Sequence, residues 1–198
     1  MVAENILLEF GASRETYHKG DQLFREGEIA LNFFQIISGE IKMNNYNADG
    51  KEFIQGMFTD GQTFGEPPLL ADVKYPANAE AIKTSEVLKL PKLNFLELLT
   101  KHPETHLKLT RTLAERLFYK AIMVSEISSQ DPEHRIIRIL DYLKRYVHQI
   151  EGQFKFKVNL TRQQIADLTG LRVETVIRAM KGLEKKGELK IRSGKVYR

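Results

Sequence analysis

The sequence contains no cysteine, which removes disulfides, iron–sulfur clusters, thiolate zinc sites and thiol nucleophiles from consideration. It also has no apolar run near the roughly 20 residues that a membrane-spanning helix requires, and its first residues carry no basic segment of a secretion signal. Hydrophobic residues nevertheless make up 42% of the chain, which is enough to form a packed core. We therefore expect a soluble, cytoplasmic protein of globular composition.

Motifs of the common enzyme classes are also missing from the sequence. We find no His-Glu-x-x-His, no phosphate-binding glycine loop followed by lysine, and no nucleophile elbow. The histidines at 18, 134 and 148 are scattered and are interpreted as surface or packing residues. We expect no enzyme activity, no metal and no cofactor, with a haem held by His102 or His106 as an alternative.

The charge of the chain is divided unevenly along its 198 residues, a length that suits two small domains. Residues 131–198 carry 16 Lys and Arg against 8 Asp and Glu, a net charge of +8. The preceding 130 residues carry 14 against 18, a net charge of −4. This asymmetry is typical of a nucleic-acid-binding domain attached to an acidic body, although a solvated basic surface would have the same composition.

The first half of the chain has the pattern of an all-β domain. Between residues 20 and 90, short β-branched and aromatic runs such as 32–37 and 86–90 alternate with glycine at roughly the 8–12-residue spacing of antiparallel strands. The dipeptide Asp49-Gly50 between two such runs indicates a hairpin. We predict a β-roll or small barrel over residues 1–102.

A helical pattern follows over residues 103–130. Residues at alternating spacings of three and four form an a/d seam, and further apolar residues lie off this stripe. A helix that is apolar on two sides can pack on its own domain with one side and on a second copy with the other. The alternative is one face buried inside a monomer. The predicted dimerisation residues are Leu107, Thr110, Ala114, Leu117, Ala121 and Val124.

Residues 131–198 contain the most informative segment. Thr161 to Gln164 has the form of a capping box, and Gly170 permits a sharp turn before a second short helix. The second helix has an apolar face and an outer face with Glu174 and Arg178, as in a helix-turn-helix unit. Two basic runs around Ser193-Gly194 predict a small β-hairpin wing. The alternative is a sensor or scaffold module whose helical tail binds protein.

The chemistry of base recognition fits the outer face of that second helix. An arginine can donate two hydrogen bonds to a guanine, and a glutamate can accept one from cytosine. Because Glu174 and Arg178 are four residues apart, they project from one face, where Glu174 could also orient Arg178. Arg162 and Lys181 are better placed for phosphates, which position a protein without specifying sequence.

Together, these segments resemble the cyclic AMP receptor protein/FNR (CRP/FNR) family of bacterial transcription regulators over about residues 18–198. The resemblance implies an α+β fold with a cyclic-nucleotide-binding-type β-roll (a double-stranded β-helix), a dimerisation helix and a winged helix-turn-helix. It also implies a homodimer on a pseudo-palindromic double-stranded DNA site, with RNA polymerase as a partner. The matching segments are 161–166, 170–171, 173–176 with Arg178, and 61–66.

Within that resemblance, Glu174 and Arg178 occupy the main base-reading positions. Val173 stands where the cyclic AMP receptor branch has an arginine, so we predict a TTG-type half-site rather than a GTGA-type core. Arg172 stands at the helix N-cap, where the family has Ser or Thr. The predicted DNA-binding residues are Thr161, Arg162, Arg172, Val173, Glu174, Thr175, Arg178 and Lys181.

The effector site departs further from the family pattern. Gly65 and Glu66 are retained, but the arginine and hydroxyl positions that hold the nucleotide phosphate fall on Tyr75 and Pro76, and Lys120 stands at an adenine-contact position. Without a guanidinium there is no bidentate phosphate partner. We therefore expect no response to cyclic nucleotides, with an atypical phosphate site at Lys74 or Lys120 as the alternative. The effector, the target genes and the sign of regulation stay open.

Overall fold

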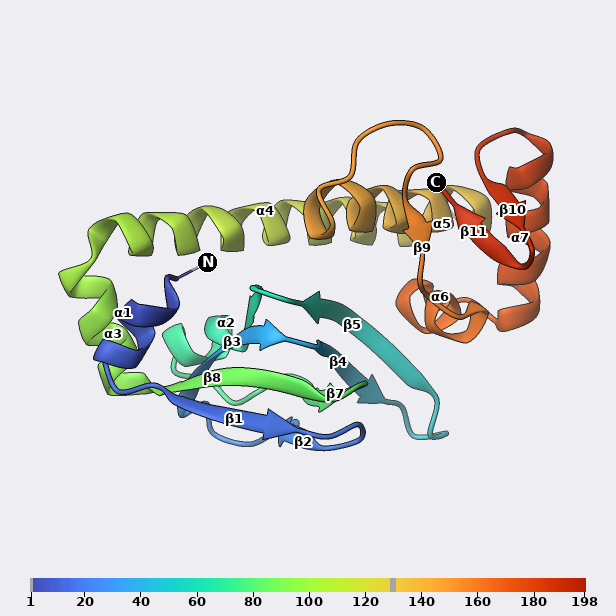
Figure 1. Ribbon diagram of the computed structural model, residues 1–198. Coiled ribbons are helices and arrows are strands. Elements are labelled where there is room, and N and C mark those ends of the chain that lie inside the picture. The colour runs from blue at the N-terminus through green and yellow to red at the C-terminus, as the bar shows by residue number, and fades with distance from the viewer. Residues whose placement is uncertain (1, 129–130) are drawn as a thin grey trace. The chain divides into compact units, whose positions relative to one another are not determined.

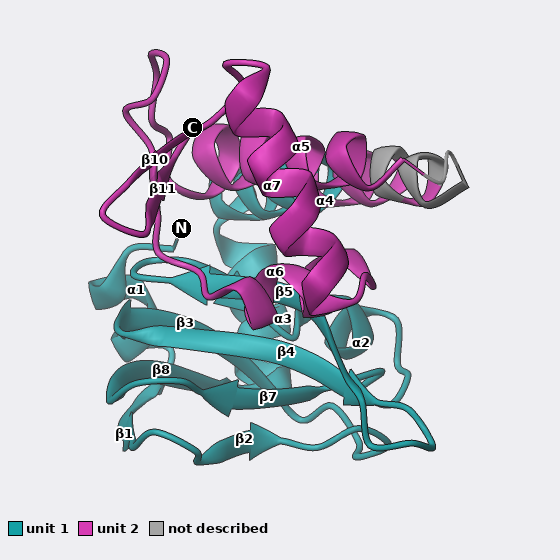
Figure 2. Cartoon of the chain, turned by 90° about the vertical axis from the view of Figure 1, so that its right-hand side faces the viewer, with its two compact units in different colours: residues 1–115 teal, residues 116–198 magenta. Residues whose placement is uncertain are grey.

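The computed structural model describes residues 2–128 and 131–198, without the side chains at positions 122, 123 and 125–128. The chain divides into two compact units, Met1–Glu115 and Arg116–Arg198 (Figure 2). The division falls within one 26-residue helix, α4 (Pro103–Ser128), so each unit includes part of this helix (Figure 1). The boundary that we placed near residue 130 lies outside the described residues.

The N-terminal unit contains two four-stranded antiparallel sheets, which confirms the predicted β-roll (Figure 1). The strand orders are β1-β8-β3-β6 and β2-β7-β4-β5. Three short helices that the sequence patterns did not predict flank the strands. The strands are β1 (Ser13–Tyr17), β2 (Gln22–Phe24), β3 (Asn32–Ser38), β4 (Glu40–Tyr46), β5 (Glu52–Thr59), β6 (Thr63–Phe64), β7 (Asn78–Ala81) and β8 (Ser85–Pro91), and the helices are α1 (Glu4–Glu9), α2 (Glu66–Leu70) and α3 (Lys92–Lys101).

Strand β3 forms the centre of this unit's core. Four consecutive residues of β3 are buried, so the strand lacks the alternation of a half-exposed strand. Phe33 stacks on Phe95 of α3 with ring centroids 4.3 Å apart, and Phe34 stacks on Phe64 of β6 at 5.3 Å. The two faces of β3 are therefore covered by different elements, and Leu109 of α4 belongs to the same core cluster.

Two turns of the β-roll depend on glycine. The predicted hairpin at Asp49-Gly50 is confirmed, because it connects β4 with β5 and Gly50 has φ 74°. Gly39 connects β3 with β4 at φ 125°, and a Cβ at this position would lie 2.5 Å from the Cα of Ser85. Since that neighbour is backbone, only glycine fits here.

The C-terminal unit combines helices with a small antiparallel sheet of order β10-β11-β9. Asp131 caps the first helix that lies wholly in this unit, accepting hydrogen bonds from the backbone nitrogens of Glu133 and His134. Tyr119 of α4 stacks on Tyr142 at 3.4 Å, so this part of α4 packs on the unit's core. The elements are α5 (Pro132–Tyr142), the π-helix η1 (Leu143–Val147), β9 (Lys157–Val158), α6 (Arg162–Thr169), α7 (Val173–Lys185), β10 (Lys190–Arg192) and β11 (Lys195–Tyr197).

Candidate nucleic-acid interface

Helix α6 begins with the predicted capping box. The Thr161 hydroxyl oxygen accepts a hydrogen bond from the Gln164 backbone nitrogen at 3.0 Å, and the Gln164 side chain accepts one from the Thr161 nitrogen at 2.8 Å. Gly170 ends the helix in the left-handed conformation at φ 67°. These two local signals fix the length of α6 and the direction in which the chain enters α7.

The C-terminal end of α6 is also held by α5. The Arg135 guanidinium donates to the backbone oxygen of Thr169 at 3.0 Å. The buried Thr169 hydroxyl donates to the Ile165 carbonyl at 2.6 Å, one turn earlier in α6. The first interaction satisfies a carbonyl at the helix end, where no further helical turn is available to do so, and the second ties the Thr169 side chain to the preceding turn. The turn between α6 and α7 is therefore supported on both sides.

Helix α7 has a buried face and an exposed face. Val176, Ala179, Met180 and Leu183 are buried in the core of the unit. Glu174 and Arg178 are exposed one turn apart, with Lys181 exposed a further turn along. An exposed helix face with acidic and guanidinium groups matches the chemistry of base edges in a major groove.

The charged groups of this face do not neutralise each other. Among the described residues, Glu174 and Arg178 do not form an ion pair, so the expected orientation of Arg178 by Glu174 is not present in this structure. Arg172 is exposed at the N-cap position of α7 and makes no capping hydrogen bond, which confirms that it is a poor cap. Its guanidinium stays available to a partner at the N-terminal end of α7.

The other predicted contact residues are less open. Arg162 is half-buried at the first position of α6, and Thr175 is half-buried on α7. Val173 packs partly against the hydrophobic core. Thr161 is exposed, but its hydroxyl is engaged in the capping box. The open part of the predicted set is therefore Arg172, Glu174, Arg178 and Lys181.

Helix α4 carries a second exposed face, along the predicted a/d seam. All six seam residues are exposed, with Leu107 at 59%, Leu117 at 70% and Val124 at 68%. Phe118, which the seam did not include, is 66% exposed beside Leu117. Leu109 and Leu113 lie on another side of the helix and pack on the core of the N-terminal unit. The seam is thus exposed in the described chain.

In the N-terminal unit, the residues of the expected effector site meet an aromatic cluster. Tyr75 is only 4% exposed and stacks on Phe24, with ring centroids 3.7 Å apart. Its hydroxyl donates to the Asn32 carbonyl at 3.3 Å, and burial raises the pKa of Tyr75 to about 12. A Cβ on Gly65 would lie 3.5 Å from the Tyr75 ring, so the backbone before α2 lies against this stack.

The remaining residues of that site lie in different environments. Glu66 is fully buried at the start of α2. Pro76 is exposed, and its carbonyl accepts a hydrogen bond from the Asn45 side chain at 2.7 Å. Lys74 is also exposed, while Lys120 lies exposed on the part of α4 that belongs to the C-terminal unit. The structure thus brings Gly65 and Tyr75 together.

Comparison with known proteins gives matches to both units. Residues 14–102 match the cyclic nucleotide-binding domain and residues 134–197 match the Crp-like helix-turn-helix domain. The cAMP-activated global transcriptional regulator CRP of Haemophilus influenzae is 28% identical over 169 residues, covering 85% of this chain and 75% of that protein. The fumarate and nitrate reduction regulatory protein of Escherichia coli is 26% identical over 180 residues, covering 90% and 72%.

This chain belongs to the CRP/FNR family of transcription regulators. Its fold agrees with solved structures, among them the c-di-GMP responsive global regulator CLP of Xanthomonas campestris, with a TM-score of 0.76 at 22% identity over 98% of both chains. The C-terminal unit is accordingly a helix-turn-helix DNA-binding domain, with α6 and α7 as its two helices. No helix among the described residues is long and apolar enough to cross a membrane.

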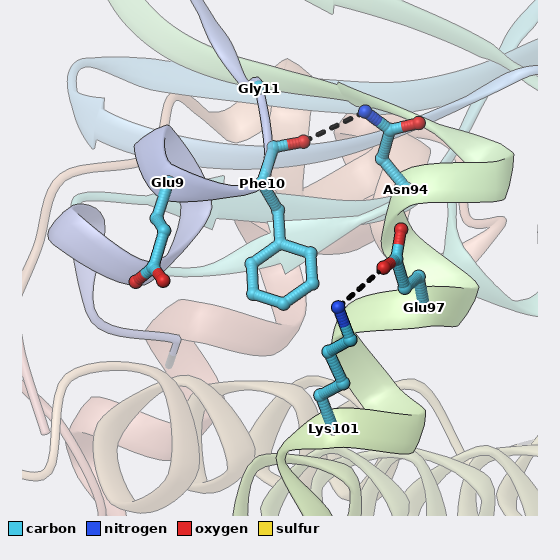
Figure 3. Close-up of a pocket in the computed structure, with 6 residues that line it drawn as sticks. All are labelled: Glu9, Phe10, Gly11, Asn94, Glu97 and Lys101. Carbon is cyan, nitrogen blue, oxygen red and sulfur yellow. Dashed lines mark hydrogen bonds and ion pairs between the residues drawn. The ribbon is translucent and has the colours of Figure 1, made fainter.

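No group of three or more potential ligands that could hold a metal occurs among the described residues. His102, considered above as a haem ligand, packs edge-on against Phe10 with centroids 5.5 Å apart. Near it, α1 and α3 border a hollow of about 390 Å³, where Asn94 donates to the Phe10 carbonyl and Lys101 pairs with Glu97 (Figure 3). The hydrogen bond of Asn94 joins α3 to the end of α1, whereas the Lys101–Glu97 pair lies within α3.

Sequence reasoning missed two sets of exposed residues. Phe118 was overlooked because it lies beside the a/d stripe, although its spacing of four from Ala114 was visible. The second set is the basic side chains of the β9–β11 sheet, which were noted only as a wing. Their alternation with Ile191 and Val196 was the available signal, because alternate residues of a strand face opposite sides.

Proposed function

We propose that this protein binds a pseudo-palindromic DNA site as a homodimer, with one α7 helix in each of two successive major grooves. The observation that carries the proposal is the exposure of Glu174 and Arg178 on one face of α7, opposite a fully packed face. Arg178 would donate to guanine and Glu174 would accept from cytosine. Arg172 and Lys181, which flank them, would contact phosphates and fix the position of the helix.

The exposed seam of α4 supports the homodimer. Leu117, Phe118 and Val124 would lose their exposed apolar area against the same residues of a second copy, and such burial favours association. Two recognition helices related by a two-fold axis would meet half-sites about 34–36 Å apart. Such a regulator would act on DNA in the bacterial cytoplasm, with RNA polymerase as the partner that its family membership suggests.

The aromatic stack supports a β-roll that does not respond to cyclic nucleotides. Tyr75 stands where nucleotide-binding relatives place an arginine, and its ring is committed to Phe24 inside the core. A phenol hydroxyl that already donates to Asn32 cannot replace the two parallel donors of a guanidinium. One relative is a cAMP-activated regulator and one structural neighbour is a c-di-GMP responsive regulator, so family membership alone does not identify an effector for this chain.

Selection of bound duplexes from a random pool tests the DNA-binding proposal. We expect an inverted repeat with one-turn spacing and, because Val173 replaces an arginine, TTG-type half-sites. The affinity should fall steeply with salt, since phosphate contacts release counterions. If the pool returns no enriched duplex and binding to DNA is independent of salt, the helical tail binds protein instead and the proposal fails.

Calorimetry with cyclic AMP and cyclic GMP tests the effector proposal separately. We expect no heat of binding for either nucleotide at protein concentrations that detect micromolar affinity. A measurable dissociation constant that Lys74→Ala or Lys120→Ala abolishes would instead establish an atypical phosphate site. The exposed Lys83→Ala is the matched control for the loss of one positive charge.

A further inference from the structure

Residues 74–78, called the effector segment below, are fixed by contacts within the N-terminal unit. They include Tyr75 and Pro76, where the family resemblance predicts the phosphate contacts, and they end at the first residue of β7. The Tyr75 backbone nitrogen donates to the Glu28 carbonyl at 2.9 Å, and the Gly27 nitrogen donates to the Tyr75 carbonyl at 2.9 Å. The connection between β2 and β3 therefore holds the segment from one side.

Asn45 of β4 holds the effector segment from another side. Its Nδ2 atom donates to the Pro76 carbonyl at 2.7 Å and to the Glu26 carboxylate at 2.8 Å. Its Oδ1 atom accepts a hydrogen bond from Nε2 of Gln55, on β5, at 2.5 Å. The two donors and the acceptor of this amide are all engaged. A reversed amide would place its oxygen against two acceptors, so the surroundings admit only one orientation of Asn45.

Asn78 makes a second connection of the same kind. Its Oδ1 atom accepts from the Glu26 backbone nitrogen at 3.0 Å, and its Nδ2 atom donates to the Asn44 carbonyl at 3.2 Å. Glu26 thus contacts one asparagine through its carboxylate and the other through its backbone. These hydrogen bonds tie the effector segment to β4, to β5 and to the connection between β2 and β3. The residues that make them, called the amide network below, are Glu26, Asn45, Gln55 and Asn78.

The amide network engages donors that an anionic ligand would require. Pro76 has no N–H group, and the N–H of Tyr75 is bonded to the Glu28 carbonyl. Both donors of the Asn45 amide are used, one of them by the Glu26 carboxylate. This carboxylate supplies negative charge beside the effector segment, and like charge disfavours the approach of a phosphate.

Helix α4 connects this region physically with the DNA-binding unit. Met43, two residues before Asn45 on β4, packs on the core cluster that includes Leu109 of α4. Further along the same helix, Tyr119 packs on the core that contains the buried faces of α6 and α7. Because one helix takes part in both cores, the packing of the β-roll can influence the unit that carries α7.

We propose that the amide network replaces an effector, holding residues 74–78 in one conformation so that this regulator binds its operator without a bound ligand. The inference rests on the proposed function, a DNA-binding protein whose β-roll does not respond to cyclic nucleotides. In a ligand-dependent regulator, the effector selects the competent conformation through its binding free energy. Here internal hydrogen bonds select it on folding. Occupancy of the operator is then controlled by the amount of protein and not by a small molecule.

Native mass spectrometry tests ligand independence with the purified protein and the operator returned by selection. The complex should have the mass of two chains and one duplex, without a further component. A small molecule present in every operator-bound dimer would overturn the inference, because the competent conformation would then depend on an effector.

Hydrogen exchange tests the amide network itself. In ligand-free wild-type protein, the backbone amides of Gly27 and Tyr75 should be protected. Asn45→Ala removes three hydrogen bonds, so exchange of both amides should become at least about tenfold faster. Operator affinity should fall about fivefold, in proportion to the fraction of molecules that keep the competent conformation. Asn5→Ala, which shortens an exposed asparagine of α1, is the matched control and should change neither quantity.

Reversing the polarity of one hydrogen bond separates the amide network from a general loss of stability. Asn45→Asp places a carboxylate against Glu26 and the Pro76 carbonyl, so it should accelerate exchange more than Asn45→Ala does. Adding Glu26→Gln gives the new carboxylate a donor. The double variant should therefore recover part of the exchange protection and part of the operator affinity, which a general loss of stability would not allow.

Two exchange results would overturn the inference while leaving the proposed function intact. One is rapid exchange of the Gly27 and Tyr75 amides in ligand-free wild-type protein. The other is unchanged protection or unchanged operator affinity in Asn45→Ala. A measurable dissociation constant for cyclic AMP or cyclic GMP would instead refute the effector part of the proposed function. Failure of the random pool to return an operator would refute its DNA-binding part.

Discussion

The two units place their predicted binding residues in opposite environments. In the C-terminal unit, Glu174 and Arg178 extend from α7 into solvent without pairing to each other. In the N-terminal unit, Tyr75 is turned inward and is stacked on Phe24. The proposed DNA-binding surface therefore leaves its charged groups available to a partner, while Tyr75, a residue of the expected effector site, is part of the core.

Because of this difference, the exposed residues of α7 should affect binding and the buried Tyr75 should affect stability. Exposed charges contribute little to the free energy of unfolding, and their replacement acts mainly on a partner's affinity. A buried ring contributes contacts and apolar burial, and its removal acts mainly on folding. Substitutions of the exposed charges of α7 should therefore change DNA affinity, whereas substitutions of the buried ring in the N-terminal unit should change the free energy of unfolding.

The largest loss of DNA affinity is expected from substitutions on the exposed seam of α4. Leu117→Glu with Val124→Glu places charges on a face that we expect to meet its copy, so light scattering should report a monomer. Operator affinity should fall about 10²–10⁴-fold, because the two half-sites are then bound independently. The control is Leu93→Glu, which changes a residue that is 79% exposed on α3. A double variant that remains dimeric would show that the seam is not the interface.

The next effect concerns the aromatic stack. Tyr75→Ala should lower the free energy of unfolding by about 3 kcal/mol, because it removes a buried ring from contact with Phe24 and leaves a cavity. Urea titration measures this loss, and Lys74→Ala serves as the exposed neighbour. Operator affinity of the folded variant should stay within about twofold. A large drop in DNA affinity without loss of stability would break the separation between the units.

Arg178→Ala should have the opposite effect to Tyr75→Ala, with a loss of operator affinity and no loss of stability. Its stability should be unchanged, while operator binding should weaken by about 1–3 kcal/mol and preference at one base pair should relax. Arg178→Lys should not restore that preference, since an ammonium lacks the two parallel donors of a guanidinium. Lys181→Ala is the comparison, with an expected loss that is equal for all sequences. A uniform loss in Arg178→Ala as well would assign Arg178 to phosphate contact.

Features that depend on residues close together in the sequence were predicted correctly from the sequence. The capping box of Thr161 and Gln164 and the turn at Gly170 each depend on residues within four positions, so the sequence alone predicted them. The exposed face of α7 followed from helical periodicity. The α+β fold and the family were reachable because these local signals occur together in one order along the chain.

Features that depend on residues far apart in the sequence, or on very short elements, could be found only in the tertiary structure. The family resemblance predicts that Tyr75 stands at an arginine position, but only the fold places its ring on Phe24, a residue of the distant strand β2. The exposure of the basic side chains of the β9–β11 sheet on one face likewise depends on the register of three strands, two of which are only three residues long. Helices α1 and α2 are too short for a helical period to emerge from the sequence.

The smallest predicted effect follows from the buried Tyr75 hydroxyl. Burial raises the pKa of this group to about 12 from the ordinary value of about 10, so the folded state retains a proton that the unfolded chain releases. The stabilisation is complete below pH 10 and is lost as the pH rises toward 12, by about 1–2 kcal/mol. Urea titrations at pH 9 and pH 11 measure this loss.

Tyr75→Phe, which retains the stacked ring, should lose less stability over the same interval, because it has no proton to release. An equal loss in wild type and Tyr75→Phe would mean that other tyrosines, such as the partly buried Tyr119 with its raised pKa, account for the alkaline sensitivity.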